Sequence, residues 1–102
     1  MERREAFKRW LQNEKSNKFD KYISKNTIKS YTKGIHKISE VMYEAEIIDK
    51  RLYSINNIDE VQVAVEQIRQ DDMYLNLNKI SENMYHKALN YYTSFIESKG
   101  NN

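Results

Sequence analysis

The chain is 102 residues long, which is enough for one domain with a single modest core. With 39% apolar and 12% aromatic residues it is too hydrophobic to be disordered, and without cysteine it has neither a disulfide framework nor a thiolate metal site. The net charge is only +2, no apolar stretch resembles a signal peptide or a membrane span, and the lack of cysteine fits a cytoplasmic location.

The charges are distributed unevenly along the chain. Residues 1–39 hold 11 lysines and arginines against 4 acidic residues, whereas residues 52–102 hold 4 against 7. Such an asymmetry is expected of a protein with an anionic partner on one side. A solvated lysine-rich surface explains it equally well, so charge alone does not decide between the two.

The absence of proline and the presence of only two glycines favour helix throughout. The helical spacing of Phe7, Trp10 and Leu11 predicts a first helix over Arg3–Glu14. The polar stretch Asn13–Lys18 ends it. A short helix or an anchored loop follows, with three apolar anchors: Phe19, Tyr22 and Ile23.

A second helix is predicted over Lys25–Glu46, with Ser24 or Asn26 as its N-cap, because either side chain can accept an N–H of the first turn. Gly34 lies inside this helix, where it either allows a close helix crossing or is simply tolerated at a cost of about 1 kcal/mol relative to alanine. An apolar stripe is formed by Ile28, Tyr31, Ile35, Ile38, Val41 and Met42. Lysines recur at every fourth position, roughly opposite that stripe: Lys21, Lys25, Lys29, Lys33 and Lys37.

The second half of the chain predicts two more long helices. Residues 47–58 are expected to be irregular, with Leu52, Tyr53, Ile55 and Ile58 as anchors. A third helix follows, capped by Asn57 or Asp59 and ending at about Gln70. The segment Asp71–Lys79 is predicted to be a loop. Ser81 is expected to cap the last helix, with Gly100 just past its end.

Four main helices therefore predict a small all-α bundle with one core. The core is expected to contain Phe7, Trp10, Leu11, Ile28, Tyr31, Ile35, Ile38, Val65, Ile68, Leu89, Tyr92 and Phe95.

The residue patterns give no support for catalysis by this chain alone. His36 and His86 stand fifty residues apart without a metal-binding spacing, so no metal site and no cofactor are predicted. Glu97-Ser98-Lys99 matches a fragment of metal-dependent nucleases but closes a predicted helix, where a charged helix end is expected. The eight tyrosines lack the arginines and histidine that a nucleophilic tyrosine requires around a phosphate, and no glycine-rich phosphate loop is present.

Two polar ridges are instead typical of nucleic-acid binding. Small polar side chains, lysines and helix N-terminal N–H groups are the usual phosphate contacts. The first ridge holds Lys21, Ser24, Lys25, Asn26, Thr27, Lys29, Ser30, Lys33 and Lys37. The second lies on the last helix and holds Asn83, Lys87, Asn90 and Ser94. Asparagine can read adenine edges in the major groove, and lysine can reach guanine acceptors. Ordinary exposed helix faces are the alternative explanation for both ridges.

Three segments resemble a known family. The run from Phe7 to Leu11 (FKRWL) is similar to the opening helix of the SAM-like core-binding domain of phage integrases and other tyrosine recombinases. The run from Ser24 to Tyr31 (SKNTIKSY) resembles the Ser-x-x-Thr-Ile-x-x-Tyr signature of that domain's second helix. Residues 81–100 resemble its last helix. Residues 47–79 are longer and more irregular, and are more similar to helical N-terminal domains attached to restriction endonucleases.

The resemblance implies a four- to five-helix SAM-like bundle that clamps one side of duplex DNA while a separate catalytic domain closes the other. The partners implied are double-stranded DNA and a covalently attached recombinase or nuclease domain, with no membrane and no small-molecule substrate. The signature places Ser24, Thr27 and Lys29 near phosphates, and Asn83 and Lys87 on the DNA-facing side of the last helix. The expected function is that of a non-catalytic DNA-binding domain, a fragment of a larger enzyme. The alternatives are a helical protein–protein interaction module and a small regulatory protein.

Overall fold

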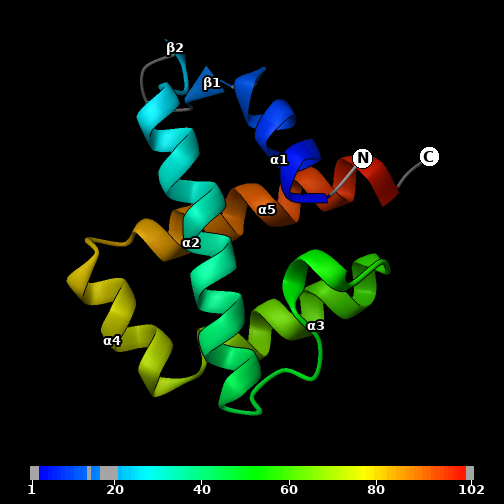
Figure 1. The fold of residues 1–102 in the computed structure, drawn as a ribbon, viewed down its shortest axis with the longest axis vertical. Coiled ribbons are helices and arrows are strands. Elements are labelled where there is room, and N and C mark those ends of the chain that lie inside the picture. The colour runs from blue at the N-terminus through cyan, green and yellow to red at the C-terminus, as the bar shows by residue number, and fades with distance from the viewer. Residues whose placement is uncertain (1–2, 14, 17–20, 101–102) are drawn as a thin grey trace.

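The computed structural model describes residues 3–13, 15–16 and 21–100. Five α-helices account for most of this part of the chain, which confirms the predicted all-α bundle (Figure 1). In chain order the elements are α1 (Arg3–Gln12), β1 (Lys15–Ser16), β2 (Lys21–Tyr22), α2 (Lys25–Glu44), the 3-10 turn η1 (Leu52–Ser54), α3 (Ile58–Arg69), α4 (Asp72–Ile80) and α5 (Met84–Gly100). None of the helices in the described ranges combines the length and apolar character needed to cross a membrane.

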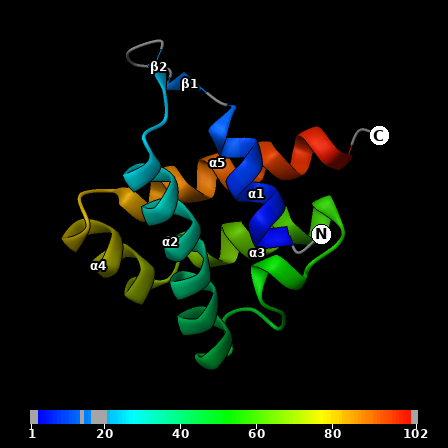
Figure 2. The ribbon, with the colours of Figure 1, turned by 45° about the horizontal axis from the view of Figure 1, so that its top comes forward.

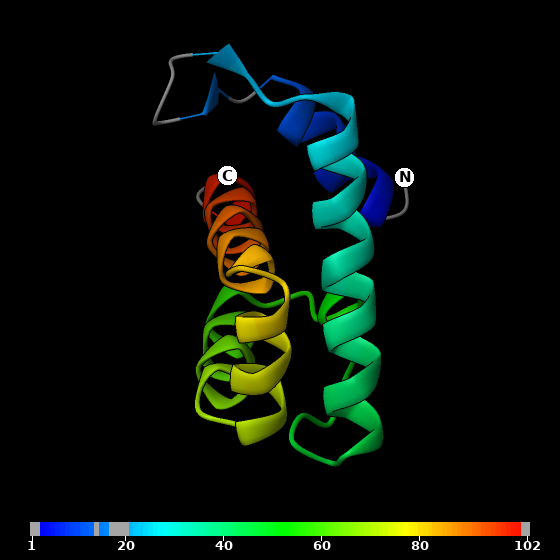
Figure 3. The same ribbon diagram turned by 90° about the vertical axis from the view of Figure 1, so that its left-hand side faces the viewer.

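The helices form a flat body two layers thick. Figure 3 shows α1 and α2 on one side and α3, α4 and α5 on the other. The Cα atoms extend 36 × 34 × 19 Å, and the short dimension fits two layers of helices whose axes lie about 8–10 Å apart. The long helix α2 crosses α5 near the middle of the body (Figure 1). Gly34 lies at this crossing, next to Met84 and Tyr85.

Helix α2 begins where the sequence predicts and ends slightly earlier. The Ser24 hydroxyl oxygen accepts the Thr27 N–H at 3.2 Å, as expected of the N-cap. At the other end, the Ile47 N–H donates to the Met42 carbonyl and the Glu46 N–H donates to the Tyr43 carbonyl. This pattern is a Schellman motif, and it places Glu46 in the left-handed region with φ 62°.

One apolar cluster joins all five helices to the segment between α2 and α3. Every residue of the predicted core is buried except Trp10, which is partly buried and packs against the cluster. Phe7 lies edge-on to Tyr92 at 5.1 Å between ring centroids, and Trp10 and Phe95 meet at 5.8 Å. These contacts fix α1 across α5.

The segment between α2 and α3 is held by hydrogen bonds as well as by packing. The predicted anchors Leu52 and Ile55 are buried, while Tyr53 and Ile58 pack at the edge of the core. The Leu52 N–H donates to the Ser39 hydroxyl at 2.7 Å, and the Leu52 carbonyl accepts the Tyr92 hydroxyl at 3.1 Å. The Tyr53 hydroxyl donates to the Thr32 carbonyl at 3.0 Å. The segment therefore has a fixed path despite its irregular backbone.

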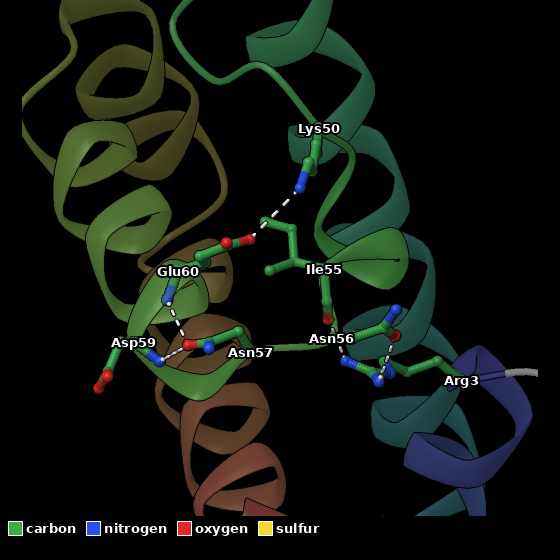
Figure 4. A network of polar contacts seen from close by, with 7 residues as sticks. All are labelled: Arg3, Lys50, Ile55, Asn56, Asn57, Asp59 and Glu60. Carbon is green, nitrogen blue, oxygen red and sulfur yellow. Dashed lines mark hydrogen bonds and ion pairs between the residues drawn. The ribbon is translucent and has the colours of Figure 1, made fainter.

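Asn57 caps α3, as predicted. Its side-chain oxygen accepts the Asp59 N–H at 2.8 Å and the Glu60 N–H at 3.3 Å (Figure 4). Arg3 of α1 reaches the residues before this cap, where its guanidinium donates to the Ile55 carbonyl and to the Asn56 side chain.

The prediction of a loop over residues 71–79 is wrong, because this segment is helix α4. The Asp71 carboxylate accepts the N–H groups of Met73 and Tyr74 and so caps the helix. Ser81 then ends α4 instead of starting the last helix, since its N–H donates to the Leu77 carbonyl.

The last helix also differs from its prediction at both ends. It begins at Met84, two residues later than a Ser81 cap implies. Gly100 is the last residue of α5 and does not follow it. Within the part of the chain that the structure describes, no glycine has a positive φ.

Between α1 and α2 the chain forms a short antiparallel hairpin, in place of the expected helix or loop. Lys15 pairs with Tyr22 and Ser16 pairs with Lys21. The hairpin projects at one end of the molecule (Figure 2). The prediction of Tyr22 as an anchor is wrong, because Tyr22 is 65% exposed, whereas Ile23 packs against the core. The predicted anchor Phe19 lies outside the described residues.

Candidate nucleic-acid interface

A groove runs between α1 and the first half of α2, and its walls are strongly basic. We call it the α1–α2 groove. Its charged lining consists of Arg4, Lys8, Lys25, Lys29 and Lys33, with Glu5 as the single carboxylate. Two polar side chains, Gln12 and Asn26, complete the rim, and Ile28 and Thr32 form the floor. Five cations around one acid create a positive field suited to an anion.

The core packing of the two helices puts these cations together. Phe7 and Leu11 are fully buried on the inner face of α1, so Arg4 and Lys8, which are four residues apart, share an outer face. On α2, burial of Ile28 and Thr32 turns Lys25, Lys29 and Lys33 outward along the neighbouring edge. Because α1 packs against α2, the two rows face one groove.

The sequence pattern places the first ridge on α2 and does not reveal the contribution of α1. Arg4 and Lys8 are spaced one helical turn apart in a basic first helix, which is a usable signal. Their position beside the α2 lysines depends on how α1 packs against α2, and sequence periodicity does not give the angle between two packed helices.

Ser24 and Thr27 use their side chains locally. The Ser24 hydroxyl donates to the Thr27 hydroxyl at 2.9 Å in addition to capping the helix. Both residues thus have a structural role at the start of α2, and this start faces solvent because Ser24, Lys25 and Asn26 are exposed.

The remaining residues of the first ridge lie outside the groove lining. Ser30 and Lys37 are exposed on α2. The backbone of Lys21 forms part of β2, while its side chain lies outside what the structure describes.

The second ridge divides into residues with different surroundings. Asn83 precedes α5, has a left-handed φ of 69°, and starts the helix by accepting the Lys87 N–H at its backbone carbonyl. Its side-chain oxygen accepts a hydrogen bond from the Asn78 amide at 3.2 Å. The Asn90 oxygen accepts a hydrogen bond from the Arg69 guanidinium of α3. Lys87 and Ser94 are exposed. Two of the four residues, Asn83 and Asn90, therefore have intramolecular partners.

The candidate catalytic residues do not assemble into a reactive site. His36 and His86 are exposed on different helices. Glu97 accepts a hydrogen bond from Gln62, and the Lys99 ammonium lies over the Phe95 ring at 5.3 Å, so both pack locally. No group of three or more His, Cys, Asp or Glu side chains in residues 3–13, 15–16 and 21–100 could hold a metal ion.

Tyr92 and Tyr53 are also unsuited to nucleophilic attack. Burial raises the pKa of Tyr92 to about 12, although the nearby Arg3 opposes part of this rise. Burial also raises the pKa of the Tyr53 hydroxyl, and its neighbour Tyr92 adds to the shift. Both hydroxyls donate to backbone carbonyls of the core, which favours the protonated form.

Comparison of the chain with protein-family models, with curated proteins and with solved structures gives no match.

Proposed function

We propose that this protein is a non-catalytic DNA-binding domain whose α1–α2 groove contacts the phosphates of a duplex. The observation that carries the proposal is the set of five cations, drawn from two helices, that surround a single carboxylate in that groove. The sequence resemblance to core-binding domains supports the same conclusion, because its signature falls at the start of α2. The attached catalytic domain, of the recombinase or restriction-nuclease class, would then cut or join the DNA that this domain holds.

The chemistry of the groove favours phosphate over base recognition. Lysine ammonium groups act as point charges on flexible stems, and they suit phosphate oxygens at varied positions. Contacts of this kind fix the position of a protein on DNA without reading its sequence. The proposed role is therefore to hold and orient a duplex.

The test compares three double variants that each remove two positive charges. Arg4→Gln with Lys8→Gln alters the α1 wall, and Lys29→Gln with Lys33→Gln alters the α2 wall. Lys79→Gln with Lys99→Gln removes the same charge from the second half of the chain. Affinity for a random-sequence duplex is measured by fluorescence anisotropy at several salt concentrations.

We expect both groove variants to bind more weakly, and the slope of log K against log salt to fall by about 0.9 for each phosphate that the variant no longer neutralises. The control variant should match the wild type. If the control weakens binding as much as the groove variants, net charge explains the affinity and the groove is not the interface. Binding without salt dependence would favour the interaction-module alternative.

A further inference from the structure

A second groove lies at the other end of α2 and has the opposite charge. It is formed by the segment that follows α2, by Ile55 and by the outer face of α3, and we call it the α3 groove. Four carboxylates surround it: Glu46, Asp49, Asp59 and Glu60. Its apolar surface comes from Ile47, Ile48, Ile55, Val63 and Ala64.

The carboxylates outnumber the cations of the groove. Lys50 is the only cation among the lining residues, and its ammonium pairs with Glu60 at 3.4 Å (Figure 4). Three acids of the lining remain beyond that pair. They stand beside apolar surface, a combination that suits a cationic segment with apolar side chains better than a bare cation.

Val63 gives the groove a second feature, an exposed aliphatic side chain. The core-facing residues of α3, from Val61 to Ile68, are at most 5% exposed, whereas Val63 is 57% exposed. A second shallow hollow on α3 adjoins it and is lined by Val63 together with Asp59 and Glu66. An aliphatic side chain therefore stands on α3 between two hollows with acidic rims.

We propose that the α3 groove binds a lysine- or arginine-rich segment of a partner protein, with an aliphatic side chain of that segment seated against Val63. The acidic rim complements the basic residues, and the apolar surface complements the aliphatic one. Anionic occupants such as DNA or acidic lipid headgroups are repelled by the same rim.

A second copy of this chain matches the proposed occupant less closely than a heterologous segment. The cations of the α1–α2 groove line a hollow, and a hollow does not enter another one. The β1–β2 hairpin does project and is basic, but the exposed apolar side chain of its described residues is the aromatic ring of Tyr22. A second copy would thus bring a ring where the proposal places an aliphatic side chain.

The two grooves are far enough apart for simultaneous use. The α1–α2 groove lies at the N-terminal half of α2, and the α3 groove begins just after its C-terminal end. Helix α2 has 20 residues, so it is about 30 Å long. A duplex on one groove leaves the other open to a protein partner. This proposal does not depend on DNA being the ligand of the first groove.

The test uses a fluorescent amphipathic peptide, acetyl-Lys-Lys-Leu-Leu-Lys-Lys-Leu-Leu-Lys-amide, and the same peptide with glutamate in place of lysine. Two groove variants of the full chain are compared, Val63→Ser and the double variant Glu46→Gln with Asp49→Asn. The matched controls are Ile80→Ser, an exposed aliphatic residue on α4, and the double variant Asp72→Asn with Glu82→Gln. Circular dichroism establishes that each variant is folded.

We expect the basic peptide to bind the wild type and the acidic peptide not to bind. Each groove variant should weaken binding about five- to tenfold, or about 1–1.4 kcal/mol, with both controls within about twofold of the wild type. Equal weakening by the controls, or no effect of either groove variant, would overturn the proposal. So would a concentration-dependent dimer in sedimentation that Val63→Ser disperses, because the occupant would then be a second copy. DNA affinity is measured in parallel and should not fall in the groove variants, which separates this result from that of the first groove.

Discussion

Gly34 and Met84 meet where α2 crosses α5, so closely that a β-carbon on residue 34 would lie 2.8 Å from the Met84 sulfur. Such an approach brings the two helices together and allows the Tyr31 and Tyr91 rings to stack nearby at 5.3 Å between centroids. Of the two explanations that the sequence offers for a glycine inside α2, the close crossing is therefore confirmed.

Substitution of Gly34 should depend on the residue at position 84. Gly34→Ala gains about 1 kcal/mol of helix propensity but displaces the Met84 side chain. We expect Gly34→Ala to stabilise the protein by about 1 kcal/mol in a Met84→Ala background and by less in the wild type. Gly34→Leu should cost about 1–3 kcal/mol because the helices must separate. Urea denaturation of the wild type, the two single variants Gly34→Ala and Met84→Ala, and their double variant measures the coupling between positions 34 and 84. Equal effects of Gly34→Ala in both backgrounds would contradict it.

The ends of α2 and α4 share an unusual feature that leads to a second prediction. At each end a glutamate occupies the left-handed position that glycine usually fills, Glu46 with φ 62° and Glu82 with φ 55°. A left-handed conformation costs a residue with a β-carbon about 1–2 kcal/mol. Glu46→Gly and Glu82→Gly should therefore each stabilise the protein by up to about 1 kcal/mol, after allowance for the greater freedom of glycine in the unfolded chain.

Lys37→Gly serves as the control for these two variants, because Lys37 is exposed in the interior of α2. It should lower stability by about 1 kcal/mol. Thermal denaturation of the three variants, each compared with the wild type under the same conditions, measures these changes in stability. A decrease in stability at both glutamate positions would mean that their carboxylates make interactions worth more than the backbone cost.

The same helix ends explain why the sequence does not predict α4. A start signal is present, since Asp71 is a favourable N-cap. The end signal is hidden, because Glu82 stands where glycine would mark a C-terminus. The apolar residues of α4 also give no clear stripe, because Tyr74 is buried while Leu75 and Ile80 are half or more exposed. Helices α1, α2 and α3 are predictable because the apolar stripe of each is clear and, in α2 and α3, the N-cap agrees with it.

The candidate interface is predictable to the extent that it depends on one helix. The lysine row of α2 follows from periodicity, and three of its members line the α1–α2 groove. The addition of Arg4 and Lys8, and the contact of Asn90 with Arg69, depend on packing between helices. Side-chain volumes set that packing across the whole core, and no local pattern encodes it.

The buried tyrosines predict a decrease in stability at high pH. The pKa of Tyr92 is raised to about 12 in the fold by burial, against about 10 in the unfolded chain. The neutral phenol therefore stabilises the fold fully below about pH 10, and this contribution disappears as the pH rises from 10 towards 12. A shift of this size corresponds to about 3 kcal/mol.

Tyr92→Phe should lower stability at neutral pH and reduce the loss of stability at alkaline pH. At neutral pH it removes the hydrogen bond to the Leu52 carbonyl and should cost about 1 kcal/mol. At pH values above about 10 its stability should fall less steeply than that of the wild type. Tyr43→Phe removes a more exposed hydroxyl and is the control. Parallel alkaline curves for wild type and Tyr92→Phe would show that another group causes the decrease.

Two residues of the second ridge, Asn90 and Lys87, should affect stability differently when replaced. Asn90 accepts a hydrogen bond from Arg69, whose Nε atom is buried and has no hydrogen-bond partner among the described residues. Asn90→Ala should therefore lower stability by about 1–2 kcal/mol, because it removes the side-chain oxygen that accepts a hydrogen bond from the Arg69 guanidinium. Lys87 is exposed, so Lys87→Gln should leave stability unchanged.

If the second ridge contacts a duplex, Lys87→Gln should affect DNA binding more than Asn90→Ala does, the opposite of their effects on stability. Lys87→Gln should then weaken affinity and reduce the salt slope by about 0.9, whereas Asn90→Ala should change neither once the protein is folded. If Asn90 instead reads a base, its replacement would reduce discrimination between duplex sequences by about 1–3 kcal/mol. Competition between a preferred and a random duplex separates these outcomes. Unchanged affinity and discrimination in both variants would mean that the ridge is a solvated helix face, with DNA contact confined to the α1–α2 groove.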